Sequence, residues 1–91
     1  MITSDQIRAA RALLRWSSAD LAERSGVGSA TIKRMESMSG VPSGHVKTLL
    51  ALKSALEVAG VEFLGSPESA PGVCLTRVEK NTDKRGGKDD N

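Results

Sequence analysis

Two neighbouring basic residues are the side chains of this chain best suited to binding another molecule. Lys33 and Arg34 fall on the outer side of a predicted helix, residues 29–36, away from its apolar residues Ile32 and Met35. Ammonium and guanidinium groups donate hydrogen bonds to guanine O6 and N7, and hydroxyl and methyl groups suit other bases. The candidate base-reading residues are Ser29, Ala30, Lys33 and Arg34. The same pattern is also typical of a solvated helix face.

The residues before this helix predict a second helix and a tight turn that would hold the two at a fixed angle. Ser17 is a suitable N-cap, and Asp20 three residues later gives an acidic form of the capping box. Gly26 follows the predicted helix and is able to adopt the left-handed backbone that ends it. Val27 is apolar inside the turn and is expected to attach it to the core. The later helix would then be free to enter a groove of DNA.

Residues 17–36 resemble the helix-turn-helix of the Cro/repressor-like (XRE) family of small bacterial and phage regulators. The resemblance depends on spaced apolar, Ala and Gly residues, namely Leu21, Ala22, Gly26, Val27, Ile32 and Met35. The flanking segments QIRAARALLRW and GVPSGHVKTLLALKSALEVAGVEFL are similar to the rest of such a domain, so the resemblance extends over roughly residues 3–64. Two positions depart from the pattern: Ser18 replaces the usual Gln, and Ser25 replaces an apolar residue.

The resemblance also implies an ion pair and a set of contacts to the DNA backbone. In the family, an Arg of the first helix pairs with the Glu that ends the recognition helix, and Arg11 and Glu36 match these positions. Two solvated charges on separate helices are the alternative. The candidate phosphate contacts are Ser18, Thr31 and Lys47.

Hydrophobic periodicity predicts two further helices. Thr3 and Gln6 have the spacing of a capping box, and the apolar residues that follow recur at helical intervals. A longer helix is predicted from an N-cap at Ser43 to Gly60. Its apolar face is expected to be wide and to close the core, and it comprises Val46, Leu49, Leu50, Leu52, Leu56 and Ala59.

Two short alternating runs, residues 61–64 and 73–76, predict a β-hairpin, with a segment between them that is too long for a two-residue turn. The run EKNTDKRGGKDDN has no apolar residue and is predicted to be disordered. We therefore expect an all-α fold, a compact four-helix repressor-like helix-turn-helix domain with a short C-terminal hairpin and a disordered tail. The predicted divisions are residues 1–60, the hairpin extension 61–78 and the tail 79–91.

Composition limits the chain to one small domain with an aliphatic core. The 91 residues include only 2% aromatic residues, and the net charge of +2 is weak support for a nucleic-acid partner. A single cysteine and the lack of an apolar signal or membrane segment lead us to expect a cytoplasmic protein. His45 and Cys74 have no partners in sequence for catalysis or a metal site. We expect no enzyme activity and no cofactor.

Two functions remain as hypotheses. The first is a transcriptional regulator, a repressor or autoregulator, that binds double-stranded DNA at a near-palindromic operator as a homodimer. The hairpin is the expected dimerisation element, although it could instead pack on the last helix of its own chain, or that helix could form the contact. The second is a protein-interaction module, an antiactivator or an antitoxin whose tail binds a partner protein.

Overall fold

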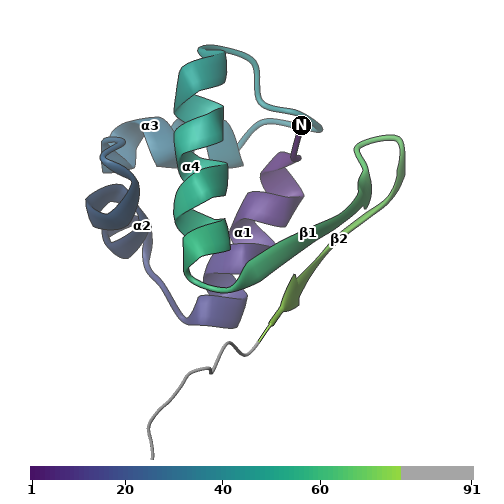
Figure 1. The fold of residues 1–91 in the computed structure, drawn as a ribbon. Helices are drawn as coiled ribbons and strands as arrows, with labels where there is room; N and C mark the ends of the chain where they lie inside the picture. Colours follow the sequence, from purple (N-terminus) through teal and green to yellow (C-terminus); the bar gives the residue numbers. More distant parts are fainter. Residues whose placement is uncertain (77–91) are drawn as a thin grey trace, which may run out of the picture.

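Four helices and a hairpin make up residues 1–76, the part of the chain that the structure describes (Figure 1). In this computed structural model the elements are α1 (Ser4–Leu14), α2 (Ser18–Ser25), α3 (Ser29–Glu36), α4 (Val46–Val58), β1 (Val61–Ser66) and β2 (Ser69–Leu75). The prediction of a compact, mainly helical domain with four helices and a hairpin is confirmed. The predicted disordered tail, residues 79–91, lies outside the described residues.

The first two helices begin at the capping boxes predicted from the sequence. The Gln6 backbone N–H donates to Thr3 Oγ1 at 3.1 Å, and Thr3 N–H donates to Gln6 Oε1 at 2.8 Å. Ser17 and Asp20 make the same reciprocal bonds, at 2.9 and 3.0 Å, at the start of α2. Two backbone donors that a helix end would leave unpaired are thereby bonded at each site.

An aliphatic core lies between the four helices and the hairpin. Its buried residues are Ile2, Ile7, Ala10, Leu21, Ile32, Met35, Leu49, Leu52, Leu56 and Val61. The two aromatic residues, Trp16 and Phe63, are partly buried against its edge. With so few large side chains, each segment that covers this core contributes appreciably to stability.

Helix α4 differs from the prediction at its start and in the width of its buried face. His45 has an extended backbone and is the N-cap, without a side-chain cap bond, so Ser43 does not cap the helix. Val46 and Leu50 are 58% and 49% exposed. The prediction of a wide buried face on α4 is therefore wrong. Only Leu49, Leu52 and Leu56 are buried, because these three side chains are enough to cover the small core.

The hairpin is longer and its turn tighter than predicted. Ser66 pairs with Ser69, so only two residues connect the strands. The register shifts between Leu64 and Ser66, where Gly65 has a φ of +71° and a Cβ would overlap the carbonyl of Ala70. At this shift two residues of β2, Ala70 and Pro71, lie opposite Gly65 alone, and this bulge lets both strands continue through a segment that resembled a loop.

The inner face of the hairpin packs on its own domain. Val61 is buried, and Phe63, Val73 and Leu75 pack against the core. From α1, the Gln6 amide nitrogen donates to Leu64 O at 3.2 Å and to Gly72 O at 2.9 Å, one carbonyl from each strand. The hairpin therefore folds onto its own domain, as the alternative held, but it packs on α1 as well as on the last helix.

Because the hairpin completes the core, Val61→Ala should destabilise the domain by about 2 kcal/mol, through lost apolar burial and the cavity that remains. Val41→Ala, the same change at an exposed valine of the α3–α4 loop, is the matched control and should change stability by less than about 0.5 kcal/mol. Urea unfolding followed by circular dichroism measures both. Equal effects would show that the hairpin does not contribute to the core.

Candidate nucleic-acid interface

The turn between α2 and α3 has the conformation predicted from Gly26. Gly26 has a φ of +78°, and its N–H donates to Ala22 O at 2.9 Å. The Val27 N–H donates to Ser25 Oγ at 3.1 Å, while Val27 packs against the core. Ser25, which departs from the family pattern, thus supplies a hydrogen-bond acceptor inside the turn. This bond helps to fix the angle between the two helices.

Helix α3 has one buried and one exposed side. Ile32 and Met35 are buried, whereas Ala30, Lys33 and Arg34 are exposed. The remaining candidates are distributed over three helices: Ser29 and Thr31 are half-buried in α3, Ser18 is half-buried in the first turn of α2, and Lys47 is exposed in the first turn of α4. The backbone of α3 therefore presents Ala30, Lys33 and Arg34 on one open surface.

The C-terminal end of α3 is bound to α1 by a set of polar contacts, which we call the α1–α3 contact. Arg11 Nε and Nη2 each donate to a different carboxylate oxygen of Glu36, both at 2.7 Å. Ser4 Oγ donates to Met35 O at 2.7 Å, and Arg8 donates to the carbonyl of Glu36. Carbonyls that end α3 without a helical partner are thereby bonded by side chains of α1.

Arg11 and Glu36 form a bidentate pair that is largely removed from water. The Glu36 side chain is 8% exposed and the Arg11 side chain 22%. Hydrogen bonding to the carboxylate raises the pKa of Arg11, against the opposing effect of burial, and the charge of Glu36 adds to the rise. Arg11 also donates to Trp16 O at 2.9 Å. A fork of this geometry holds α3 in one orientation on α1.

Sequence reasoning identified Arg11 and Glu36 but not Ser4 or Arg8. Ser4, Arg8 and Arg11 are separated by four and then three residues along α1, so they share one face of the helix. That spacing was the available signal for Arg8. Ser4 is fully buried, and nothing in its local sequence distinguishes it from an ordinary first-turn serine.

A second cationic contact lies at the link between α1 and α2. The guanidinium of Arg24 lies 4.9 Å from the centre of the Trp16 ring. Trp16 is partly buried and packs against the core. This cation–π contact attaches the C-terminal end of α2 to the end of α1.

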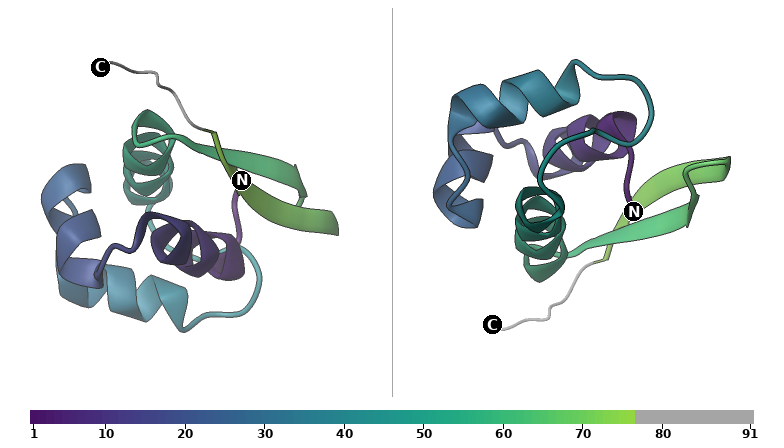
Figure 2. Two further views of the ribbon diagram at one scale, coloured as in Figure 1. Left: turned by 90° about the horizontal axis from the view of Figure 1, so that it is seen from below. Right: turned by 90° about the horizontal axis from the view of Figure 1, so that it is seen from above.

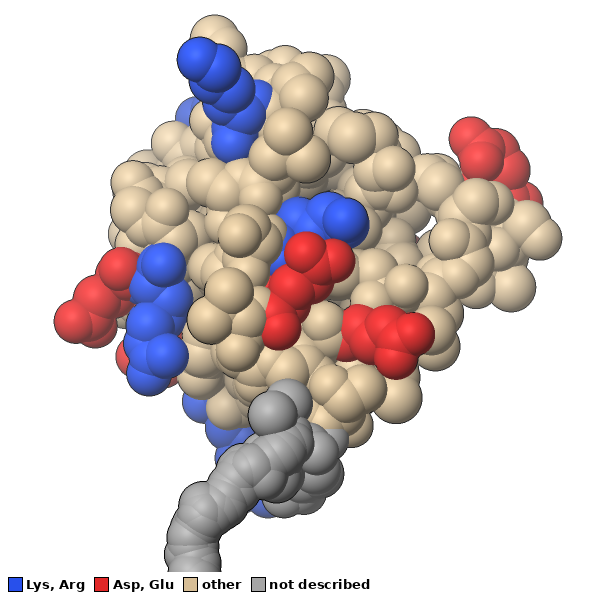
Figure 3. Space-filling model, in the orientation of Figure 1, with Lys and Arg blue, Asp and Glu red and all other residues tan. Residues whose placement is uncertain are grey.

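Charge is mixed on the face of the domain that includes α4. Figure 3 shows basic and acidic side chains interspersed there, without a continuous basic patch. Lys53 and Glu57 on α4 form a partly exposed ion pair at 3.3 Å. Non-specific attraction of a polyanion to this face is therefore expected to be weak.

A comparison with known protein families found a match for this domain. The profile described as helix-turn-helix matches residues 7–63, more than half of the chain. The chain belongs to the XRE-type helix-turn-helix family. This family is one of DNA-binding regulatory domains, in general not enzymes, so double-stranded DNA is the partner that membership implies. A comparison with curated proteins gave no match. Among the helices of residues 1–76, none has the length and apolar character needed to cross a membrane.

If Arg11 and Glu36 act as a unit, Arg11→Ala and Glu36→Ala will each lower the free energy of unfolding, and the double variant will lose less than their sum. We expect a coupling energy of about 1 kcal/mol or more, because either single change leaves a poorly solvated charge. Urea unfolding of the wild type, the two single variants and the double variant measures the four free energies that the coupling energy requires. Additive losses would show that the two charges do not interact.

Proposed function

We propose that this protein is a sequence-specific transcriptional regulator, a repressor or autoregulator, that inserts α3 into the major groove of its operator. The observation that carries the proposal is the exposure of Lys33 and Arg34 on a helix whose opposite side is held by the core and by Glu36. A helix held rigidly in this way presents its donors at fixed positions relative to the base edges.

The candidate contacts fall into two groups according to the length and the position of their side chains. Lys33 and Arg34 are long and exposed, and are assigned to guanine O6 and N7. Ala30 offers a methyl group to thymine, and Ser29, at the first position of α3, serves a base close to the helix N-terminus. The shorter or peripheral groups contact phosphates and set the register: Ser18, Thr31 and Lys47. Serine at position 18 is too short to brace a base as the usual glutamine does, so its role is confined to the backbone.

One copy contacts too few base pairs for high specificity, so the proposed active form is a homodimer on a near-palindromic site, its α3 helices about 34 Å apart. The hairpin supports this assembly with its outer side. Leu64 is 41% exposed there, and neither strand has a second neighbour among the described residues. An uncovered strand edge beside an apolar side chain is a suitable surface for a second copy. The inner face is not available, since it packs on its own core.

Base reading by Arg34 predicts a change in specificity. Arg34→Ala should cost about 1–3 kcal/mol on the operator and much less on random DNA, with preference relaxed at one base position. Lys47→Ala should weaken binding to both DNAs alike and lower the salt slope by about one phosphate contact. Fluorescence anisotropy against DNA from the promoter of its own gene, at several salt concentrations, measures both.

Lys53→Ala is the matched control, because it removes the same charge from α4 at a site already paired with Glu57, and it should leave the affinity unchanged. Equal losses for Arg34→Ala on operator and random DNA would contradict base reading. No binding to any duplex by the folded wild-type protein would favour the protein-interaction module instead.

The hairpin interface predicts that Leu64→Asp places a charge between the two copies. The variant should footprint a single half-site, while its melting temperature stays within a few degrees of wild type because Leu64 lies outside the core. Protection of both half-sites at wild-type protein concentration would rule out this part of the hairpin as the interface.

A further inference from the structure

The outer side of α4 carries a row of exposed aliphatic side chains that its own domain does not use. Val46, Leu50 and Val58 are 58%, 49% and 86% exposed. With the exposed Ser54 they form a row in which each residue follows the previous one by four positions. We call these four residues the α4 ridge. Isolated apolar side chains are ordinary on a surface, but an aligned row on one helix indicates an interaction site.

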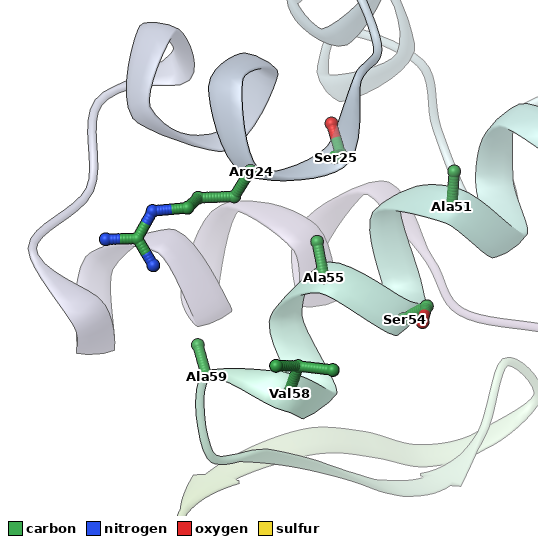
Figure 4. Close-up of a pocket in the computed structure, with 7 residues that line it drawn as sticks. All are labelled: Arg24, Ser25, Ala51, Ser54, Ala55, Val58 and Ala59. Carbon is green, nitrogen blue, oxygen red and sulfur yellow. The ribbon is translucent and has the colours of Figure 1, made fainter.

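A shallow hollow lies beside the α4 ridge. The next row of the helix is occupied by three small residues, Ala51, Ala55 and Ala59, and the end of α2 forms the opposite wall (Figure 4). The hollow has a volume of about 420 Å³, and Ser54 and Val58 of the ridge border it together with Arg24 and Ser25. A ridge of large side chains next to a groove of alanines is the surface relief that helices use to pack on one another.

We propose that a second copy of this chain docks its α4 against this face, in an antiparallel pair. The ridge of each copy enters the alanine groove of the other, so one patch serves both sides of a two-fold interface. When the axis passes between Leu50 and Ser54, Val46 of one copy meets Val58 of the other. The surface is therefore complementary to itself in shape.

The charges of α4 select the antiparallel direction. Lys47 lies in its first turn and Glu57 in its last, both exposed. The antiparallel pair brings Lys47 of each copy opposite Glu57 of the other, where it joins the contact that Lys53 already makes with Glu57 at 3.3 Å. A parallel pair would place like charges together. Antiparallel helices also oppose their dipoles favourably.

Another segment of the same chain does not fit this face. The run from Glu79 to Asn91 has no apolar side chain, so it cannot bury Leu50 or Val58. The hairpin is already held against α1 by Gln6. A second copy supplies both the apolar ridge and the opposite charge that this face requires.

The consequence for DNA rests on the proposed function. Figure 2 shows α1 between α3 and α4, so a pair joined through α4 makes its contact at an element that α1 separates from α3. Pairing through α4 leaves both α3 helices free, while Lys47 then lies in the α4 interface and its proposed phosphate contact is not made in the paired form. Two DNA-bound units joined in this way would hold two duplexes, or two distant sites of one duplex, together.

Sedimentation equilibrium without DNA tests the pairing, in a Leu64→Asp background that removes the proposed hairpin contact. The Leu64→Asp protein should form dimers, and adding Val58→Asp should weaken self-association about tenfold or more. Val41→Asp, exposed on the α3–α4 loop and outside the ridge, is the matched control. A monomeric Leu64→Asp protein, or no change on adding Val58→Asp, would overturn the proposal.

Charge reversal tests the direction of the pair. Lys47→Glu should weaken self-association, and adding Glu57→Lys should restore it in the double variant. Circular dichroism checks that each variant is folded, and all of these side chains are exposed. No rescue by the double variant would contradict the antiparallel arrangement.

Capture of a labelled duplex by an immobilised one adds a functional readout. Wild-type protein should bridge the two duplexes, and Val58→Asp should bind single duplexes normally without bridging them. Bridging by Val58→Asp equal to wild type would overturn the proposal. Loss of single-duplex binding by every variant would count against the proposed function, while the sedimentation result would still decide the α4 pairing.

Discussion

The orientation of α3 depends on polar groups of α1 that bind its C-terminal end. The α1–α3 contact joins the Arg11 fork, the Ser4 hydroxyl and the Arg8 guanidinium to the last carbonyls and the carboxylate of α3. An eight-residue helix is too short to be stable alone, so tertiary contacts must decide where it points. Because these bonds are directional, they restrict rotation of α3 about its axis in a way that apolar packing by Ile32 and Met35 would not.

The size of the core explains why the hairpin is part of the domain and not an appendage. Four short helices with two partly buried aromatics leave apolar surface at the junction of α1 and α4, and Val61, Phe63 and Val73 cover it. Gln6 then serves two purposes, since its carbonyl oxygen caps α1 and its amide nitrogen bonds both strands. The outer sides of the hairpin and of α4 are left available for other molecules.

Local interactions were predictable from sequence, and long-range ones mostly were not. The capping boxes at Thr3 and Ser17 and the turn at Gly26 depend on residues three or four apart, so the sequence contains their signal. The prediction of a long hairpin loop was wrong because the bulge of β2 opposite Gly65 arises only when the two strands pair, which the local sequence does not show. Ser4 was missed because its partner, Met35, is 31 residues away. The base-reading set follows from periodicity and stays a prediction until it is tested with DNA.

The most direct test of DNA reading by α3 is a titration of ¹⁵N-labelled protein with a duplex from its own promoter, followed by amide chemical shifts. We predict the largest changes at residues 29–34, with smaller ones at Ser18 and Lys47, where the backbone contacts are assigned. Amides of the α4 ridge and of the β1–β2 hairpin should move little when a single half-site is bound. Changes confined to α4 or the hairpin, with α3 unaffected, would contradict the account.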